Sequence, residues 1–342
     1  MKKTYFCFLI LLSLLLTSCG YHYPSEYDIG VIYTTEYYNK SEIIYLDTNW
    51  NELGKTKYPY ANMSYGGFFN SLIQDNTLYL LPKGISQRLD CGKVCALNMT
   101  SGQIKEYDFG RVNIIDYYAD NNYVYALSNL NNISYFDRMD KATNEITTLE
   151  FFEGDLDHIT MIDNQLFAIS LELESNKDKY VLYSFDITGN SFEKVCDLDI
   201  TTSPAFIETY DGNIYIPTDN ILYVYDTTKH TSHTITLPYG NAYNLNRKNN
   251  ILYIGHTDIF NGKISHITSL DLINEEISEI MQYNGTILQM EIQDNNIYIR
   301  DYDKLLQYEV NAPQDTVLIH SYSLDNGGNY YPGSFFLKPA TD

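Results

Sequence analysis

Seven copies of one strand signature, but only six copies of one turn, constrain the fold of this 342-residue chain more than any other feature. The signature has an aliphatic residue four places before, and a large apolar residue one place before, an Asp, Glu or Asn anchor. Its copies are Ile43–Asp47, Val94–Asn98, Ile133–Asp137, Leu182–Asp186, Leu222–Asp226, Ile267–Asp271 and Leu305–Glu309. The turn is a pair of Asp, Asn or Gly residues that runs into a short strand ending in Tyr or Phe. It occurs at Asp75-Asn76, Asp120-Asn121, Asp163-Asn164, Asp211-Gly212, Asn249-Asn250 and Asp294-Asn295.

The spacing of the anchors predicts a repeated four-stranded unit. Successive anchors lie 51, 39, 49, 40, 45 and 38 residues apart, which is the length of one β-propeller blade. The two apolar positions of the signature have opposite parity, and successive side chains of a strand point to opposite faces. Each such strand should therefore be buried on both faces, as stacked blades require. We predict an all-β, seven-bladed β-propeller with four-stranded antiparallel blades over residues 29–342.

The missing turn predicts how the ring closes. The first repeat begins directly with a second strand, Ile29–Thr35, and has no inner strand of its own. After the last outer strand, Thr316–Tyr322, one segment remains, Tyr330–Lys338. We expect this C-terminal segment to supply the inner strand of the N-terminal blade. Backbone hydrogen bonds would then join the two ends of the ring and hide both sheet edges.

The first twenty residues differ from the repeats and predict an export signal. Lys2 and Lys3 precede an apolar stretch, Phe6–Leu16, that is too short to span a bilayer as a mature helix. The stretch ends in Leu16-Thr17-Ser18-Cys19-Gly20, which resembles the lipobox of bacterial lipoproteins. The alternative is an ordinary secretory signal with a chance cysteine.

The lipobox resemblance implies a cleavage site and an address. Residues 1–18 would be a lipoprotein signal peptide, and residues 19–28 the lipidated cysteine and a short tether. The Cys19 thiol would carry diacylglycerol, and further acylation (palmitate or a similar chain) would hold the protein firmly on a membrane. The expected location is the bacterial cell envelope, lipid-anchored on the extracytoplasmic face.

Charge excludes one class of partner. The formal net charge is −22, the sequence pI is about 4.5, and Lys and Arg are scattered. No basic patch is available to neutralise phosphates, so nucleic acid is not an expected partner.

The blades resemble the bacterial propellers of the quinoprotein-like and YVTN type. The resemblance rests on blade lengths and on phrases such as Leu97–Gly102 and Phe185–Gly189. Quinone-dependent members repeat a Trp motif in each blade, whereas this chain has a single Trp, Trp50. The resemblance therefore implies the fold, and no quinone cofactor is expected.

Few candidate catalytic residues point to the channel mouth. His158 opens an expected inner strand and so approaches the axis, where a structural role is the alternative to a role as a base. Glu172 and Glu174 form a carboxylate pair, although such pairs arise by chance among 44 acidic residues. His230 and His233 lie in an outer hairpin, where solvated polar side chains are common.

No motif completes these candidates into a known chemistry. Zinc and calcium spacings and the Gly-x-Ser-x-Gly elbow are absent from the sequence, so no metal or cofactor is expected. The arginines share no motif that would predict a carboxylate-binding cluster. They are Arg88, Arg111, Arg138, Arg247 and Arg300.

The cysteines and the paired tyrosines each leave two interpretations. With Cys7 removed in the signal peptide and Cys19 lipidated, three cysteines remain as free thiols, and an odd number argues against a disulfide framework. Cys95 and Cys196 are expected to be small strand residues, with a local Cys91–Cys95 disulfide as the alternative.

The tyrosine runs either form an aromatic surface for a glycan or protein or fill the blade interfaces. They are Tyr37-Tyr38, Tyr58-Pro59-Tyr60, Tyr117-Tyr118 and Tyr330-Tyr331.

The sequence therefore favours a membrane-anchored, extracytoplasmic propeller that binds a partner rather than transforming it. The partner would be an envelope protein or a glycan, and the role that of a binding module or scaffold. The alternative is a hydrolase or lyase acting on envelope or external glycans. A sensor or immunity-type lipoprotein is a third hypothesis. A cluster of carboxylates or arginines with a histidine at one channel mouth would favour the enzyme.

Overall fold

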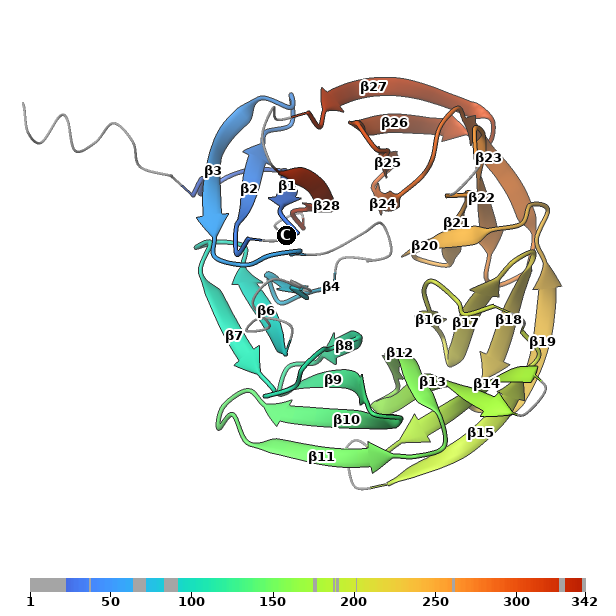
Figure 1. Ribbon diagram of the computed structural model, residues 1–342. Helices are drawn as coiled ribbons and strands as arrows, with labels where there is room; N and C mark the ends of the chain where they lie inside the picture. Colours follow the sequence, from blue (N-terminus) through green and yellow to red (C-terminus); the bar gives the residue numbers. More distant parts are fainter. Residues whose placement is uncertain are drawn as a thin grey trace, which may run out of the picture.

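A computed structural model describes residues 23–36, 38–63, 72–82, 92–174, 177–186, 188, 191–200, 202–259, 262–325 and 330–339. Within these ranges the regular structure is 28 strands in seven four-stranded sheets, arranged as a ring around a central axis (Figure 1). Every strand pair is antiparallel, so the predicted seven-bladed propeller is confirmed. The described residues form no helix long and apolar enough to span a membrane. The predicted signal peptide, 1–18, and Cys19 lie outside these ranges.

Each blade runs from an innermost strand at the axis to an outermost strand at the rim. Blade 1 contains β28 (Tyr331–Leu337), β1 (Ile29–Thr34), β2 (Ser41–Leu46) and β3 (Glu52–Tyr58). Blades 2 and 3 contain β4 (Leu72–Gln74), β5 (Thr77–Leu80), β6 (Lys93–Asn98) and β7 (Ile104–Asp108), then β8 (Asp116–Ala119), β9 (Tyr123–Leu130), β10 (Ile133–Asp140) and β11 (Ile146–Phe151). Blades 4 and 5 contain β12 (Asp155–Ile162), β13 (Gln165–Glu174), β14 (Lys177–Phe185) and β15 (Phe192–Leu198), then β16 (Glu208–Tyr210), β17 (Asn213–Thr218), β18 (Ile221–Asp226) and β19 (Thr231–Thr236). Blades 6 and 7 contain β20 (Ala242–Lys248), β21 (Ile251–His256), β22 (Ser265–Asp271) and β23 (Ile277–Tyr283), then β24 (Gln289–Gln293), β25 (Asn296–Arg300), β26 (Lys304–Ala312) and β27 (Asp315–Ser323).

The C-terminal strand closes the ring, as predicted. β28 pairs antiparallel with β1, and Gly30 lies opposite Phe336. A Cβ on Gly30 would lie 2.1 Å from Cζ of Phe336, so only glycine leaves room for this ring. The side chain of Gln289, on β24, donates to the carbonyl of Phe335 at 2.7 Å and accepts from its amide at 3.0 Å. Blade 7 is thereby hydrogen-bonded to the closing strand itself.

The core lies between the blades, because each third strand is buried on both faces. In β14, Leu182 packs towards blade 5, whereas Phe185 packs in the cluster between blades 3 and 4. Both side chains are fully buried. Burial of such a side chain stabilises the fold by about 1.5–3 kcal/mol. The opposite parity of the two apolar signature positions therefore has the structural meaning that was predicted.

Most anchors of the signature cap the hairpin between the third and fourth strands. Oδ1 of each capping residue accepts the amide two residues later, at 2.9 to 3.0 Å. These residues are Asp47, Asn98, Asp186, Asp226 and Asp271. In blade 3 the strand continues past Asp137, and Asp140 is the cap instead, accepting from Ala142 at 2.8 Å. In blade 7 the strand continues past Glu309 to Ala312.

The segment before β1 packs on the propeller. Tyr27 is only 4% exposed and lies in the core cluster between blades 1 and 2, with Tyr23 packed against it. Both tyrosine hydroxyls donate to the carbonyl of Met99. The described part of the expected tether, 23–28, is therefore part of the folded body, because its aromatic rings find an apolar site beside blade 2.

Candidate functional site

The antiparallel blades give the ring two distinct faces. We call "turn face" the end that carries the first-to-second strand turns and the third-to-fourth strand hairpins. Its turns are 75–76, 120–122, 163–164, 211–212, 249–250 and 294–295, and its described hairpin caps are Asp47, Asn98, Asp140, Asp186, Asp226 and Asp271. We call "loop face" the end that carries the second-to-third strand connections and the connections between blades. Its described residues are 35–36, 38–40, 59–63, 81–82, 92, 109–115, 131–132, 152–154, 199–200, 202–207, 219–220, 237–241, 257–259, 262–264, 284–288, 301–303, 324–325 and 330.

The turn face is acidic and hydrophilic. Asp opens five of the six tight turns, and no Lys or Arg lies in any of the six. Asp75, Asp163, Asp211 and Asp294 adopt positive φ, between 45° and 51°. Asp, Asn and Gly tolerate this left-handed conformation, which explains why the hairpin geometry selects them. The same backbone requirement thus places a ring of carboxylates on one face.

The loop face carries seven of the thirteen exposed large apolar side chains among the described residues. Seven such residues, each between 43% and 72% exposed, lie in its connections or at the strand ends that lead into them. They are Tyr38, Val112, Leu130, Phe152, Leu173, Ile264 and Tyr302. On the turn face, Ile273, Ile146 and Leu53 lie at hairpins or at the strand ends beside them, and the remaining three, Val317, Leu318 and Ile319, lie along the outermost strand β27. Exposed apolar side chains gathered on one face are typical of interaction surfaces.

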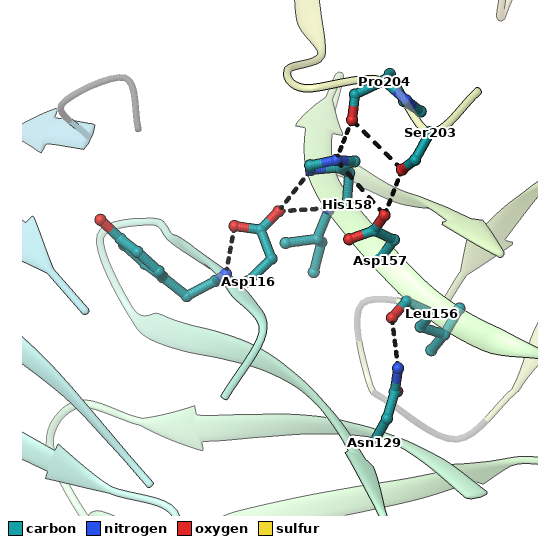
Figure 2. A network of polar contacts seen from close by, with 9 residues as sticks. Asp116, Asn129, Leu156, Asp157, His158, Ser203 and Pro204 are labelled. Carbon is teal, nitrogen blue, oxygen red and sulfur yellow. Dashed lines mark hydrogen bonds and ion pairs between the residues drawn. The ribbon is translucent and has the colours of Figure 1, made fainter. Parts of the chain in front are cut away.

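A polar cluster lies where the innermost strands of blades 3 and 4 meet the loop before blade 5 (Figure 2). His158, on β12, approaches Asp116, on β8, with 3.6 Å between Nδ1 and Oδ2. Its Nε2 lies 2.6 Å from the carbonyl of Pro204 and 3.8 Å from Asp157. Ser203 donates to Asp157 at 2.6 Å. Three successive segments of the ring are therefore joined at one histidine.

The surroundings of His158 favour its charged form. Partial burial disfavours the imidazolium, but the hydrogen bond to Asp116 and the charges of Asp157 and Asp116 outweigh it and raise the pKa. Both ring nitrogens then act as donors, to a carboxylate and to a carbonyl. A histidine held in this way ties blades together and has no free nitrogen to accept a proton as a general base.

A second histidine cluster lies in blade 6 and was not predicted. Tyr239 stacks on His266 with 3.7 Å between ring centroids, and Oε1 of Glu279 accepts from both at 2.9 Å. These two hydrogen bonds lower the pKa of Glu279. His256 is buried beside them, and burial lowers its pKa to about 4. Nothing in the sequence pattern of blade 6 predicts that these side chains come together.

The other predicted candidates do not converge on the axis. Glu172 accepts from Tyr183 at 2.6 Å in β13, and the side chain of Glu174 lies outside the described atoms. His230 bonds to Tyr225 at 3.2 Å, and His233, at the rim, to Glu275 at 2.7 Å.

The arginines are dispersed around the ring. Arg111 forms a bidentate pair with buried Asp137, at 2.5 and 2.6 Å. Arg247 lies over Tyr210, 5.2 Å from the ring centroid. Arg300 is buried in blade 7, and Arg88 lies outside the described residues. No carboxylate-binding cluster forms among the described arginines.

The cysteines and tyrosines mostly serve the core. Cys95 is buried in β6, and Cys196 is half-buried in β15, as predicted, while Cys91 lies outside the described residues. Tyr58, Tyr60 and Tyr117 are buried between blades. Tyr118, Tyr330 and Tyr331 are partly buried, and Tyr37 lies outside the described residues. Among the described members of these runs, Tyr38 is the one fully exposed on the loop face.

One open pocket of about 490 Å³ lies on the turn face of blade 4, between Asp163–Gln165, Ser184–Asp186 and Ser191–Glu193. Its lining is mostly polar. Among the described residues, no group of three or more His, Cys, Asp or Glu side chains is placed to hold a metal ion.

Comparison with known proteins supports the fold. No protein-family model and no curated protein matches the chain. A chain of the mitotic checkpoint complex matches with a TM-score of 0.53 and 10% identity, over 75% of this chain and 78% of that one. PorZ, a surface component of the Porphyromonas gingivalis type-IX secretion system, matches with a TM-score of 0.52 and 11% identity, over 85% of this chain and 38% of PorZ. The Neurospora crassa Pan2 WD40 domain matches with a TM-score of 0.52 and 10% identity, over 75% of this chain and 78% of that one. At this identity, the likenesses establish the propeller fold alone.

Proposed function

We propose that this protein is a lipid-anchored binding or scaffold module on the extracytoplasmic face of the bacterial cell envelope. The observation that carries the binding role is the loop face, a surface with exposed apolar side chains from Tyr38 in blade 1 to Tyr302 in blade 7. The lipobox ending at Cys19 supports the anchor, with 1–18 as the signal peptide.

A protein is the partner class that the surface favours. Large apolar side chains separated by polar ones are typical of protein interfaces. One solved propeller of similar fold is a bacterial surface component of a secretion system, and another belongs to a checkpoint complex. These neighbours support a role in assemblies by analogy of fold.

An enzyme acting on glycans is the second candidate, and the cluster of Asp116, Asp157 and His158 is the observation that favours it. It has the carboxylates and histidine expected of such a site. Its members are already bonded to one another and to Pro204 and Ser203, which favours the structural role.

The test of the proposed function begins with the anchor. Mass spectrometry of the protein extracted from bacterial membranes should find a diacylglycerol-modified N-terminal Cys19, and Cys19→Ser should release the protein from the membrane. Crosslinking in cells should then yield one stoichiometric protein complex. An unmodified N-terminus contradicts the anchor. Glycan cleavage that is lost in Asp116→Asn and Asp157→Asn would instead establish the enzyme.

A further inference from the structure

The N-terminal segment leaves the propeller at a fixed place on the turn face. The ring of Tyr23 packs on Gly102, in the third-to-fourth strand hairpin of blade 2, so closely that a Cβ there would lie 2.2 Å from the ring. Tyr27 donates to the carbonyl of Met99 in the same hairpin at 3.2 Å. Lys338 closes over the segment, with its Nζ 4.7 Å from the Tyr27 ring centroid and its amide donating to Asp28 at 2.8 Å.

This docking limits how far the lipid site can lie from the turn face. Cys19 precedes Tyr23 by four residues. Consecutive Cα atoms are about 3.8 Å apart, so the two Cα atoms lie within about 15 Å of one another in any conformation. A six-residue strand such as β1 rises about 20 Å, which separates the loop face from the turn face.

We propose that the turn face is held towards the membrane, and that the outward loop face is the docking surface for a protein partner with apolar and basic residues. This inference rests on the proposed lipid anchor at Cys19. The docking partner is a protein and not a lipid surface, because the loop face points away from the bilayer when the turn face is anchored.

Charge supports the second half of the proposal. Acidic residues outnumber basic ones in the described loop-face connections. The acidic residues are Glu36, Glu153, Asp199, Asp219, Asp258, Asp301, Asp303 and Asp325, and the basic ones are Lys40, Arg111 and Lys263. A basic partner complements these carboxylates. The carboxylates of the turn face repel anionic headgroups within a Debye length of about 8 Å, so the short docked tether, and not charge, has to hold this face towards the bilayer.

The orientation is tested on lipidated protein bound to phosphatidylcholine–phosphatidylglycerol vesicles that contain a spin-labelled headgroup lipid. A fluorophore is attached through p-azidophenylalanine at Ile273 on the turn face or at Tyr302 on the loop face. We expect several-fold stronger quenching at position 273. Stronger or equal quenching at position 302 overturns the orientation and identifies the apolar ring as a membrane-binding surface. Protein that lacks lipid by mass spectrometry and does not bind vesicles contradicts the proposed function itself, which separates the two failures.

The partner is tested in cells with a photocrosslinking residue at position 302. The proposal expects a discrete protein adduct that is reduced at least tenfold by Phe152→Asp with Ile264→Asp. The adduct should remain in the control variant Ile273→Asp, which replaces an exposed apolar residue on the turn face in the same way. Circular dichroism of each variant confirms folding. An adduct that forms only from position 273, one that is indifferent to the loop-face substitutions, or none at all overturns the docking surface.

Discussion

Arg300 is a charged residue that is buried between blade 7 and blade 1. It is 3% exposed, its Nε has no hydrogen-bond partner among the described atoms, and burial lowers its pKa to about 10. Arg300 lies two residues after Tyr298 in β25, so both side chains are on the face of the strand that packs against blade 1. The nearest charge that favours the guanidinium is the adjacent Asp301.

Replacing Arg300 with Met should therefore stabilise the protein. Burying a charge costs several kcal/mol in desolvation, whereas a flexible apolar side chain of similar length fills the same space. We expect a gain of about 1 kcal/mol or more, or a rise of roughly 2 °C in Tm. Arg138→Met is the matched control, because Arg138 lies over Tyr123 at 4.7 Å and should lose that contact. A lower Tm for Arg300→Met would mean that the guanidinium has a stabilising partner.

His158 should make stability depend on pH in a defined direction. Its folded pKa is raised above the unfolded value of about 6.5 by Asp116 and Asp157 against the opposing effect of burial. The stabilisation is therefore fully present below that value and is lost as pH rises through the folded pKa. The Tm difference between wild type and His158→Asn should be larger at pH 5.5 than at pH 8.5. Asp116→Asn should shrink this pH dependence, and a difference that grows with pH contradicts the assignment.

At the scale of the element, β28 makes the ring one cooperative unit. A chain that ends at Leu324 lacks β28 and leaves the inner edge of β1 unpaired. We expect it to lose the thermal transition of the whole propeller, measured by circular dichroism on the mature chain. The control chain ends at Pro339 and keeps every strand. If the shorter chain melts at the same temperature as the control, the seam does not hold the ring together.

Substitutions at Gly30 and Phe336 test the same contact between β1 and β28 at the level of single side chains. A methyl group on Gly30 would overlap the Phe336 ring, so Gly30→Ala should cost about 1–3 kcal/mol in urea unfolding. Phe336→Leu removes the ring edge, and the double variant should lose less stability than the sum of the two single variants. Simple additivity would show that the two side chains do not meet.

Periodic features of the chain were predictable, whereas convergent ones were not. Each blade repeats its own turns and its two-sided third strand, so local chemistry defines the number of blades and the closing role of Tyr330–Lys338. The cluster at His158 is different, because Asp157 lies in blade 4 and Ser203, 46 residues later, lies in the connection to blade 5. Only the placement of the inner strands brings them together. In blade 3 the hairpin cap, Asp140, lies three residues after the anchor of the signature, because β10 continues past Asp137, which pairs with Arg111.

At the scale of the molecule, the net charge of −22 predicts a dependence on salt. The tight turns concentrate carboxylates on one face, where they repel one another at low ionic strength. The mature protein at pH 7 should therefore have a higher Tm in about 150 mM NaCl than in about 10 mM NaCl, because the Debye length shortens from roughly 30 to 8 Å. A Tm that falls with added salt would mean that attractive ion pairs, such as that of Arg111 with Asp137, outweigh the repulsion.

The pairing of β28 with β1 also determines when the ring can close as the chain is made. A ribosome makes β1 among the first strands and β28 last, more than 290 residues later. Until the last residues emerge, blade 1 is a three-stranded sheet whose inner edge is open, beside six blades that cannot yet form a ring. Such an edge is a template for wrong pairing with other chains. Emergence of β28, from the ribosome or from the export channel, is therefore the step that allows the ring to close, and the open edge has to be kept apart from other chains until then.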